Sequence, residues 1–219
     1  MALDDDSLSR RVYAQLRASI VSGRLTSGTR LRERNLADEL AASRVPIREA
    51  ILRLEAEGFV QTSPRRGATV AHLHLTDVEE LYDVRLALEV QAARLAARRA
   101  GGGAATDDLG RALAEADALL SGGDEAVIAE ANASVHDRIL ELAGNRLLTS
   151  MMRPVVGRDR WIFGMISAQR NAFRTCQEHH QLCDAIFSGD VELAAALAYA
   201  HIEGGRRSTI DALRSILPD

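Results

Sequence analysis

The sequence contains no lysine, two cysteines and four prolines, and each shortage limits the kind of protein that it encodes. All 27 basic residues are arginine, a bias that genome composition alone can produce. Two cysteines are too few for a disulfide framework. Cys176 and Cys183 are seven residues apart, which is about 10–11 Å along a helix and too far for a disulfide bond. We therefore expect reduced thiols and a cytoplasmic protein.

Long apolar runs are also missing. No stretch approaches the roughly 18 apolar residues that a membrane-spanning helix requires. The N-terminal sequence MALDDDSLSRR is acidic and has no apolar core, so we do not expect a signal peptide. Hydrophobic residues make up 47% of the 219 residues and charged residues 26%, a composition that excludes a disordered or collagen-like chain. This length allows one large core or two small ones.

Charge is unevenly distributed along the chain. Residues 1–71 hold 12 arginines against 9 acidic residues, a net charge of +3, whereas residues 72–219 hold 15 arginines against 22 acidic residues, a net charge of −7. A basic N-terminal segment followed by an acidic one indicates a nucleic-acid-binding module joined to a second domain.

The spacing of apolar residues predicts three short helices in the basic segment, at residues 8–21, 34–42 and 44–58. Ser43 is the expected N-cap of the third helix. Two short strands around a Pro-Arg-Arg-Gly turn follow. Three helices with a tight turn between the last two, followed by a β-ribbon, are typical of a winged helix-turn-helix, which we assign to residues 1–73.

Arginines gather at the tips of this predicted motif. The tip of the second helix of a helix-turn-helix enters the major groove, where arginine can bind guanine O6 and N7. The turn of the ribbon can approach the minor groove. A solvated basic surface is the alternative, but the arginines converge on three tips of one motif. The candidate DNA-binding residues are Arg34, Ser43, Arg44, Val45, Arg48, Arg65, Arg66 and Gly67.

The stretch GRLTSGTRLRERNLADELAASRVPIREAILRLEAEGFVQTSPRRGATV resembles the DNA-binding domain of GntR-family transcriptional regulators. The resemblance covers about residues 8–71 without gaps. In the family, the positions that match the eight candidates contact DNA. The resemblance also implies a homodimer that binds a short palindromic operator in double-stranded DNA.

Residues 74–219 are expected to form an all-α domain of six or seven helices, at about 76–100, 106–121, 124–143, 145–166, 169–188 and 191–216. Asn132 and His136 are four residues apart on one of these helices, so their side chains point the same way. His179 and His201 lie on two later helices. Three imidazoles and one oxygen can bind a divalent metal ion, but helical histidines at such spacing more often pack or cap.

The C-terminal segment is similar to the effector domain of the FadR subfamily, called FCD. Its metal-binding branch has an Asp or Asn followed four residues later by His, then a Glu-His pair, then a His 22 residues on. The resemblance implies that Asn132, His136, His179 and His201 bind Zn, Ni, Mn or Fe, although Asn is a weaker ligand than the commoner Asp. His180 is expected outside the site. Arg85 matches a position that can bind the carboxylate of a small effector, or it forms a surface pair with Glu89.

The sequence therefore predicts a transcriptional regulator controlled by a small carboxylate effector bound beside a metal ion. Two alternatives stay open. One is a regulator that binds an acyl-CoA or another ligand without metal. The other is a metal-dependent hydrolytic enzyme, which the absence of an HExxH motif and the presence of a winged helix disfavour. We expect no enzymatic activity and no membrane partner.

Overall fold

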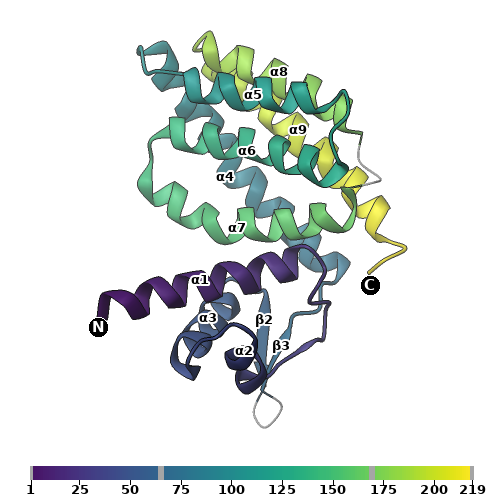
Figure 1. Cartoon of the computed structure of the whole chain (residues 1–219). Helices are drawn as coiled ribbons and strands as arrows, with labels where there is room; N and C mark the ends of the chain where they lie inside the picture. The colour runs from purple at the N-terminus through teal and green to yellow at the C-terminus, as the bar shows by residue number, and fades with distance from the viewer. Residues whose placement is uncertain (1, 64–66, 168–170, 218–219) are drawn as a thin grey trace. The chain divides into compact units, whose positions relative to one another are not determined.

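A computed structural model describes residues 2–63, 67–167 and 171–217 of the chain (Figure 1). The chain divides into two compact units, which we call the N-terminal unit (residues 1–73) and the C-terminal unit (residues 74–219). Within the described residues, no helix is long and apolar enough to cross a membrane.

The described residues of the N-terminal unit form three helices and a small antiparallel sheet. The sheet has the strand order β1-β3-β2, and Arg30 and Leu31 pair with Thr69 and Ala68. The predicted two-stranded ribbon thus gains a third, two-residue strand. The elements in chain order are α1 (Ala2–Val21), β1 (Arg30–Leu31), α2 (Glu33–Glu39), α3 (Arg44–Ala56), β2 (Val60–Ser63) and β3 (Gly67–Val70).

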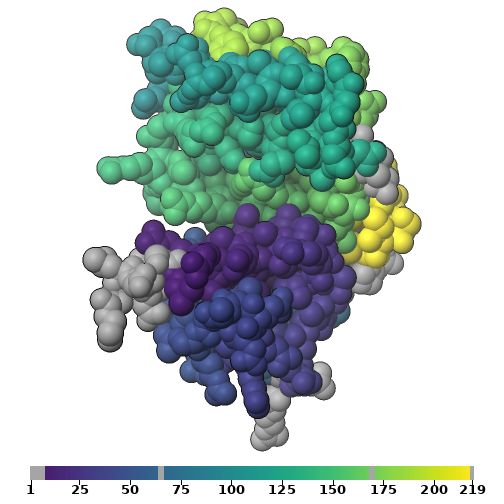
Figure 2. Space-filling model, viewed as in Figure 1, coloured from purple at the N-terminus to yellow at the C-terminus, as the bar shows by residue number. Residues whose placement is uncertain are grey.

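The core of this unit forms where the apolar stripe of α1 meets that of α3. Val12, Leu16 and Ile20 recur every four residues along α1 and are all buried. They share the core with Ile47 and Leu54 of α3, which are completely buried. Figure 2 shows the side of α1 that faces away from this core and forms part of the surface of the unit. This packing leaves the N-terminal end of α3 uncovered.

The secondary structure elements described in the C-terminal unit are all helices. Side-chain caps begin several of its helices: Asp124, Asn145, Asn171 and Asp190 each accept a hydrogen bond from a backbone N–H of the first turn. Its helices are α4 (Leu75–Gly101), α5 (Asp107–Leu119), α6 (Glu125–Ala143), α7 (Arg146–Met165), α8 (Ala172–Phe187) and α9 (Val191–Leu213).

Helix α4 is the central element of the C-terminal unit. It packs against α9 along much of its length and also contacts α6, α7 and α8. Small residues of α4 such as Ala92, Ala93 and Ala96 are buried in these contacts, and they allow the neighbouring helices to approach closely. Polar side chains from α4, α6, α7, α8 and α9 therefore come together in the middle of the bundle.

Candidate functional site

The N-terminal tip of α3 presents the residues expected to read DNA. Ser43 occupies the N-cap position, and its hydroxyl makes no hydrogen bond to the helix. Ser43, Arg44, Val45 and Arg48 are all exposed, including the apolar Val45, whose exposed fraction is 55%. Ile47 of the same helix is completely buried. The helix thus turns its apolar side to the core and its expected recognition residues to solvent.

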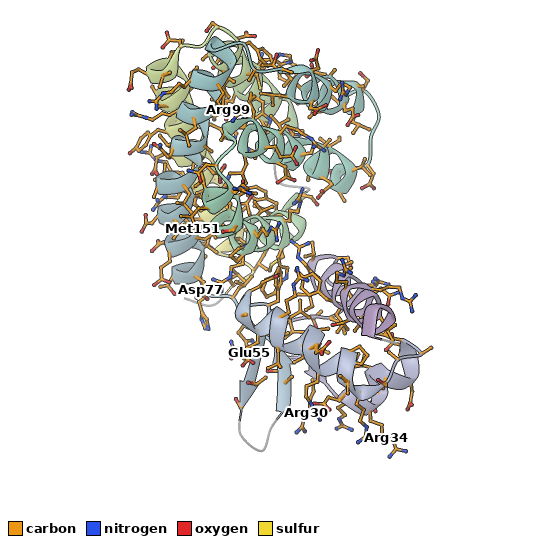
Figure 3. The ribbon with its side chains drawn as sticks, turned by 90° about the vertical axis from the view of Figure 1, so that its left-hand side faces the viewer. Arg30, Arg34, Glu55, Asp77, Arg99 and Met151 are labelled. Carbon is orange, nitrogen blue, oxygen red and sulfur yellow. The ribbon has the colours of Figure 1, made fainter. Side chains whose placement is uncertain are left out.

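The other candidate DNA-binding residues lie on α2 and on the ribbon. Arg34 is exposed on α2 and points away from the body of the N-terminal unit (Figure 3). Gly67 begins β3 with φ +77°, a left-handed conformation that favours glycine. Arg65 and Arg66 lie outside the described residues.

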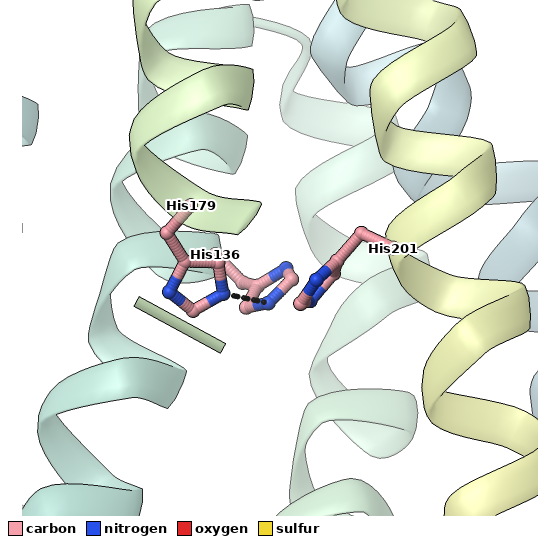
Figure 4. Close-up of side chains that lie close together, drawn as sticks. All are labelled: His136, His179 and His201. Atoms are coloured by element: carbon pink, nitrogen blue, oxygen red, sulfur yellow. Dashed lines mark hydrogen bonds between the residues drawn. The ribbon is translucent and has the colours of Figure 1, made fainter. Parts of the chain in front are cut away.

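In the C-terminal unit, His136 of α6, His179 of α8 and His201 of α9 come together (Figure 4). Their candidate ligand atoms all lie within 4.8 Å of one another. The centroids of the three imidazole rings are 4.8–5.2 Å apart. His179 and His201 are buried, and His136 is partly buried. These residues are separated by up to 65 positions in the sequence, so only the folded bundle can form this cluster.

Carboxylates lie behind two of the three imidazoles. Nδ1 of His136 lies 2.8 Å from Oε2 of Glu89, and Nδ1 of His201 lies 2.8 Å from Oε2 of Glu178. A carboxylate accepts the Nδ1 proton and so leaves Nε2 of the same ring with a free electron pair. This His–carboxylate arrangement is the usual support of a metal-binding histidine.

The electrostatics of the cluster favour ionised carboxylates at Glu89 and Glu178 and a neutral imidazole at His201. Burial alone would raise the pKa of Glu89, but the charges of Arg85 and His136 bring this pKa well below its usual range. The hydrogen bond with His201 is the main cause that lowers the pKa of Glu178. Burial lowers the pKa of His201 despite its bond to Glu178. Neutral imidazole is the form that binds a metal ion.

The distance between two of the ring nitrogens fits a shared ion. Nε2 of His136 and Nε2 of His179 are 3.1 Å apart. Two nitrogens that each lie about 2.0–2.1 Å from one ion, at an angle of about 95–110°, are separated by roughly 3.0–3.4 Å. This distance fits an ion shared by His136 and His179, and three imidazoles are a donor set that suits a divalent metal ion.

Asn132 lies beside the cluster. It lines a cavity of about 190 Å³ together with His136, His179 and His201. Its Nδ2 donates to the carbonyl of Ile128 at 3.0 Å, and its Oδ1 accepts from the thiol of Cys176 at 3.5 Å. The fold thus brings all four expected ligands to one cavity.

Arg85 is buried and ion-paired on two sides. Its Nε donates to Glu89 and its Nη1 donates to Asp159, both at 2.6 Å. The pair with Glu89 was one of two interpretations, but it is buried and not on the surface. Burial opposes the charge of Arg85, yet Asp159 and Glu89 raise the pKa of Arg85 above its usual range. Arg85 also lines two cavities that His201 lines, one of about 30 Å³ and one of about 150 Å³.

Some parts of this network could not be foreseen from the sequence. The Gly-Arg-Asp-Arg segment at 157–160 lies inside α7, within the helix expected at 145–166, and its Gly157 and Asp159 are buried. Asp159 was not recognised as a partner of Arg85. His180 lies outside the cluster and bonds Asp117 at 2.7 Å.

Comparison with known proteins agrees with both units. The model of bacterial regulatory proteins of the gntR family matches residues 8–70, and the FCD domain model matches residues 80–204. A protein of Paenarthrobacter nicotinovorans described as "Probable D-xylose utilization operon transcriptional repressor" is 30% identical over 90% of each chain. The Nta operon transcriptional regulator of Aminobacter aminovorans is 30% identical over 84% of this chain and 85% of its own.

A solved GntR transcriptional regulator from Rhodococcus sp. RHA1 has the same fold. It superposes with a TM-score of 0.78 at 25% identity, covering 95% of this chain and 100% of its own. These relatives are transcriptional regulators and not enzymes, which agrees with the prediction of no enzymatic activity. The chain therefore belongs to the GntR family of DNA-binding transcriptional regulators and carries an FCD domain after its winged helix-turn-helix.

Proposed function

We propose that the C-terminal unit binds a divalent metal ion and that a small carboxylate effector bound beside this ion controls DNA binding. The observation that carries the proposal is the cluster of three histidines backed by two carboxylates. His136, His179 and His201 would hold the ion through nitrogen, and Asn132 would contribute its oxygen. This donor set suits Zn, Ni, Mn or Fe, so availability would select the metal.

The effector would lie where the cavities meet the cluster. A bound ion supplies positive charge for a carboxylate. Arg85 uses Nε and Nη1 for its ion pairs, which leaves Nη2 as the nitrogen that could bind the effector. The three cavities that histidines of the cluster line have volumes of about 30, 190 and 150 Å³. Such volumes favour a small acid over an acyl-CoA.

The N-terminal unit would read a palindromic operator as part of a homodimer. Arg34, Ser43, Arg44, Val45 and Arg48 would contact the major groove or its phosphates, and the turn with Arg65, Arg66 and Gly67 would contact the minor groove. A dimer presents two such units to half-sites about one helical turn, 34–36 Å, apart or less.

Thermal unfolding with and without a chelator tests the metal site. An ion at a hundredfold excess over its dissociation constant stabilises the folded state by about 2.7 kcal/mol. EDTA should therefore lower the melting temperature of the natural protein and leave that of His179→Ala unchanged. His180→Ala is the matched control, because His180 lies on the same helix outside the cluster, and it should respond like the natural protein. An equal response of all three proteins would refute the site.

The effector is tested on the same proteins with a panel of small carboxylic acids added after metal loading. At least one acid should raise the melting temperature of the natural protein and weaken or strengthen its operator binding. The same acid should do neither in His179→Ala. An acid that acts equally on both proteins would place the effector site away from the ion.

A further inference from the structure

An acidic side chain holds one of the expected DNA-reading arginines. Arg48 of α3 donates two parallel hydrogen bonds to Glu33 at the start of α2, from Nε to Oε1 at 3.0 Å and from Nη2 to Oε2 at 2.8 Å. This is the bidentate geometry that a planar guanidinium forms with a carboxylate. The side chain of Arg48 is 64% exposed and that of Glu33 is 35% exposed. The paired bonds, and not burial, therefore fix the orientation of Arg48.

The two hydrogen bonds to Glu33 leave one edge of the guanidinium of Arg48 available. Arginine has five N–H donors, and Glu33 uses one from Nε and one from Nη2. The remaining donors lie on Nη1 and on the far side of Nη2. Two donors are sufficient to bind O6 and N7 of guanine. Arg48 can thus contact a base without releasing Glu33.

The surroundings of Glu33 are otherwise basic. A groove of about 520 Å³ lies between the start of α2, α3 and the strands of the ribbon, and among the described residues that line it Glu33 is the one acid beside Arg30, Arg32 and Arg48. An unpaired carboxylate here would repel DNA phosphates. Its bonds to Arg48 offset part of this repulsion.

We propose that Glu33 is a specificity-determining positioning residue, which holds Arg48 in the orientation that reads one base pair of each operator half-site. Because the guanidinium is fixed before binding, less rotational freedom is lost when the complex forms. The positioning also excludes other rotamers in which Arg48 would bind any nearby phosphate. This inference rests on the proposed role of Arg48 in operator recognition.

Selection from a library of duplexes with a randomised central segment provides the test. The natural protein and Arg48→Ala together identify the base-pair position that Arg48 reads. Glu33→Gln has nearly the same shape but only one oxygen and no charge, so preference at that position should fall about tenfold. Affinity for random-sequence duplex should stay equal or rise, because a negative charge has been removed. Adding Glu33→Gln to Arg48→Ala should change the preference no further.

Controls separate positioning from a general loss of structure. Glu39→Gln removes an exposed acid from the same helix and should leave every base preference unchanged. Glu33→Asp keeps the charge but shortens the side chain, so it should lose the same preference as Glu33→Gln while its thermal unfolding matches that of the natural protein. If Glu33→Gln keeps the preference or gains affinity for the selected site, the inference is wrong. If Arg48→Ala itself keeps all preferences, the proposed recognition by Arg48 fails first.

Discussion

Single nitrogen atoms decide what the histidine cluster can bind. Glu89 and Glu178 face Nδ1 of His136 and His201, which directs Nε2 of each ring toward the shared space. His179 then brings its own Nε2 to 3.1 Å from that of His136. Together these contacts orient the cluster before any ligand arrives, and pre-oriented ligands give up less freedom on binding.

At the tip of α3, replacing one exposed arginine should alter recognition without altering the fold. Arg44→Ala removes a side chain at the start of the helix, and we expect a loss of about 1–3 kcal/mol on the selected operator with relaxed base preference. Arg65→Ala, in the predicted Pro-Arg-Arg-Gly turn, should instead weaken all duplexes about equally, and fluorescence anisotropy on operator and random duplexes would measure both. Arg138→Gln, an exposed arginine of the C-terminal unit paired with Glu141, is the control. Normal operator binding by Arg44→Ala would contradict the docking.

The two cysteines should be chemically silent in the folded protein. Both are free and buried, and burial raises the pKa of the Cys183 thiol to about 12. Since the thiolate is the reactive form, neither cysteine should react with a thiol reagent such as Ellman's reagent until the protein unfolds in denaturant. Rapid labelling of either cysteine in native conditions would show that the bundle is less tightly packed than described.

At the scale of elements, the helical boundaries follow from local signals in the sequence. The expected helix at 124–143 is observed at Glu125–Ala143 with Asp124 as its cap, and the one at 191–216 is observed at Val191–Leu213. Apolar spacing and capping residues carry this information. Two residues such as Arg30 and Leu31 are too few to show a strand pattern, and their pairing with β3 depends on the folded unit.

The candidate sites were predictable to different degrees. His136, His179 and His201 could be named from family spacing, and the fold brings them together. Asp159 carried no signal, because its pairing with Arg85 spans 74 residues. Long-range partners of this kind depend on how helices pack.

A close approach between two helix ends gives a test at this scale. Gly189 has φ +74°, and a Cβ there would lie 2.8 Å from the Cα of Gly101. A left-handed conformation costs a non-glycine residue about 1–2 kcal/mol, and the clash adds to it, so Gly189→Ala should lower the free energy of unfolding by more than that. Urea denaturation would measure the loss.

Gly110 provides the matched control. It lies inside α5, it has no positive φ, and a Cβ added there would meet no atom within 4 Å apart from its chain neighbours and the nearby backbone of its own helix. Gly110→Ala should therefore raise the free energy of unfolding by about 0.5–1 kcal/mol. If both alanine variants changed stability in the same direction, the close approach at Gly189 would not be real.

At the scale of the whole molecule, the two units differ in charge and in the role that we expect of each. The N-terminal part is basic and the C-terminal part acidic, which favours DNA contact through the first unit only. The C-terminal unit has the larger core, so we propose that it carries the dimer contact. Residues 74–219 expressed alone should sediment as a dimer at micromolar concentration, and a clean monomer would contradict this proposal.

DNA binding by the full chain should depend strongly on salt. Each phosphate that an arginine neutralises contributes about −0.9 to the slope of log affinity against log salt. Operator titrations at several salt concentrations should therefore give a steep negative slope, which Arg65→Ala should make less steep by about one such contribution. A flat dependence would show that phosphate contacts do not dominate binding.

Metal content is the most direct test of the account, because the ion connects the histidine cluster to effector control. The natural protein and the variants His179→Ala and His180→Ala would be loaded with Zn, Ni, Mn or Fe, dialysed, and measured by mass spectrometry of the elements. We predict about one ion per chain for the natural protein and for His180→Ala, and almost none for His179→Ala. A natural protein that retains none of the four metals, or a His179→Ala variant that retains as much as the natural protein, would contradict the account.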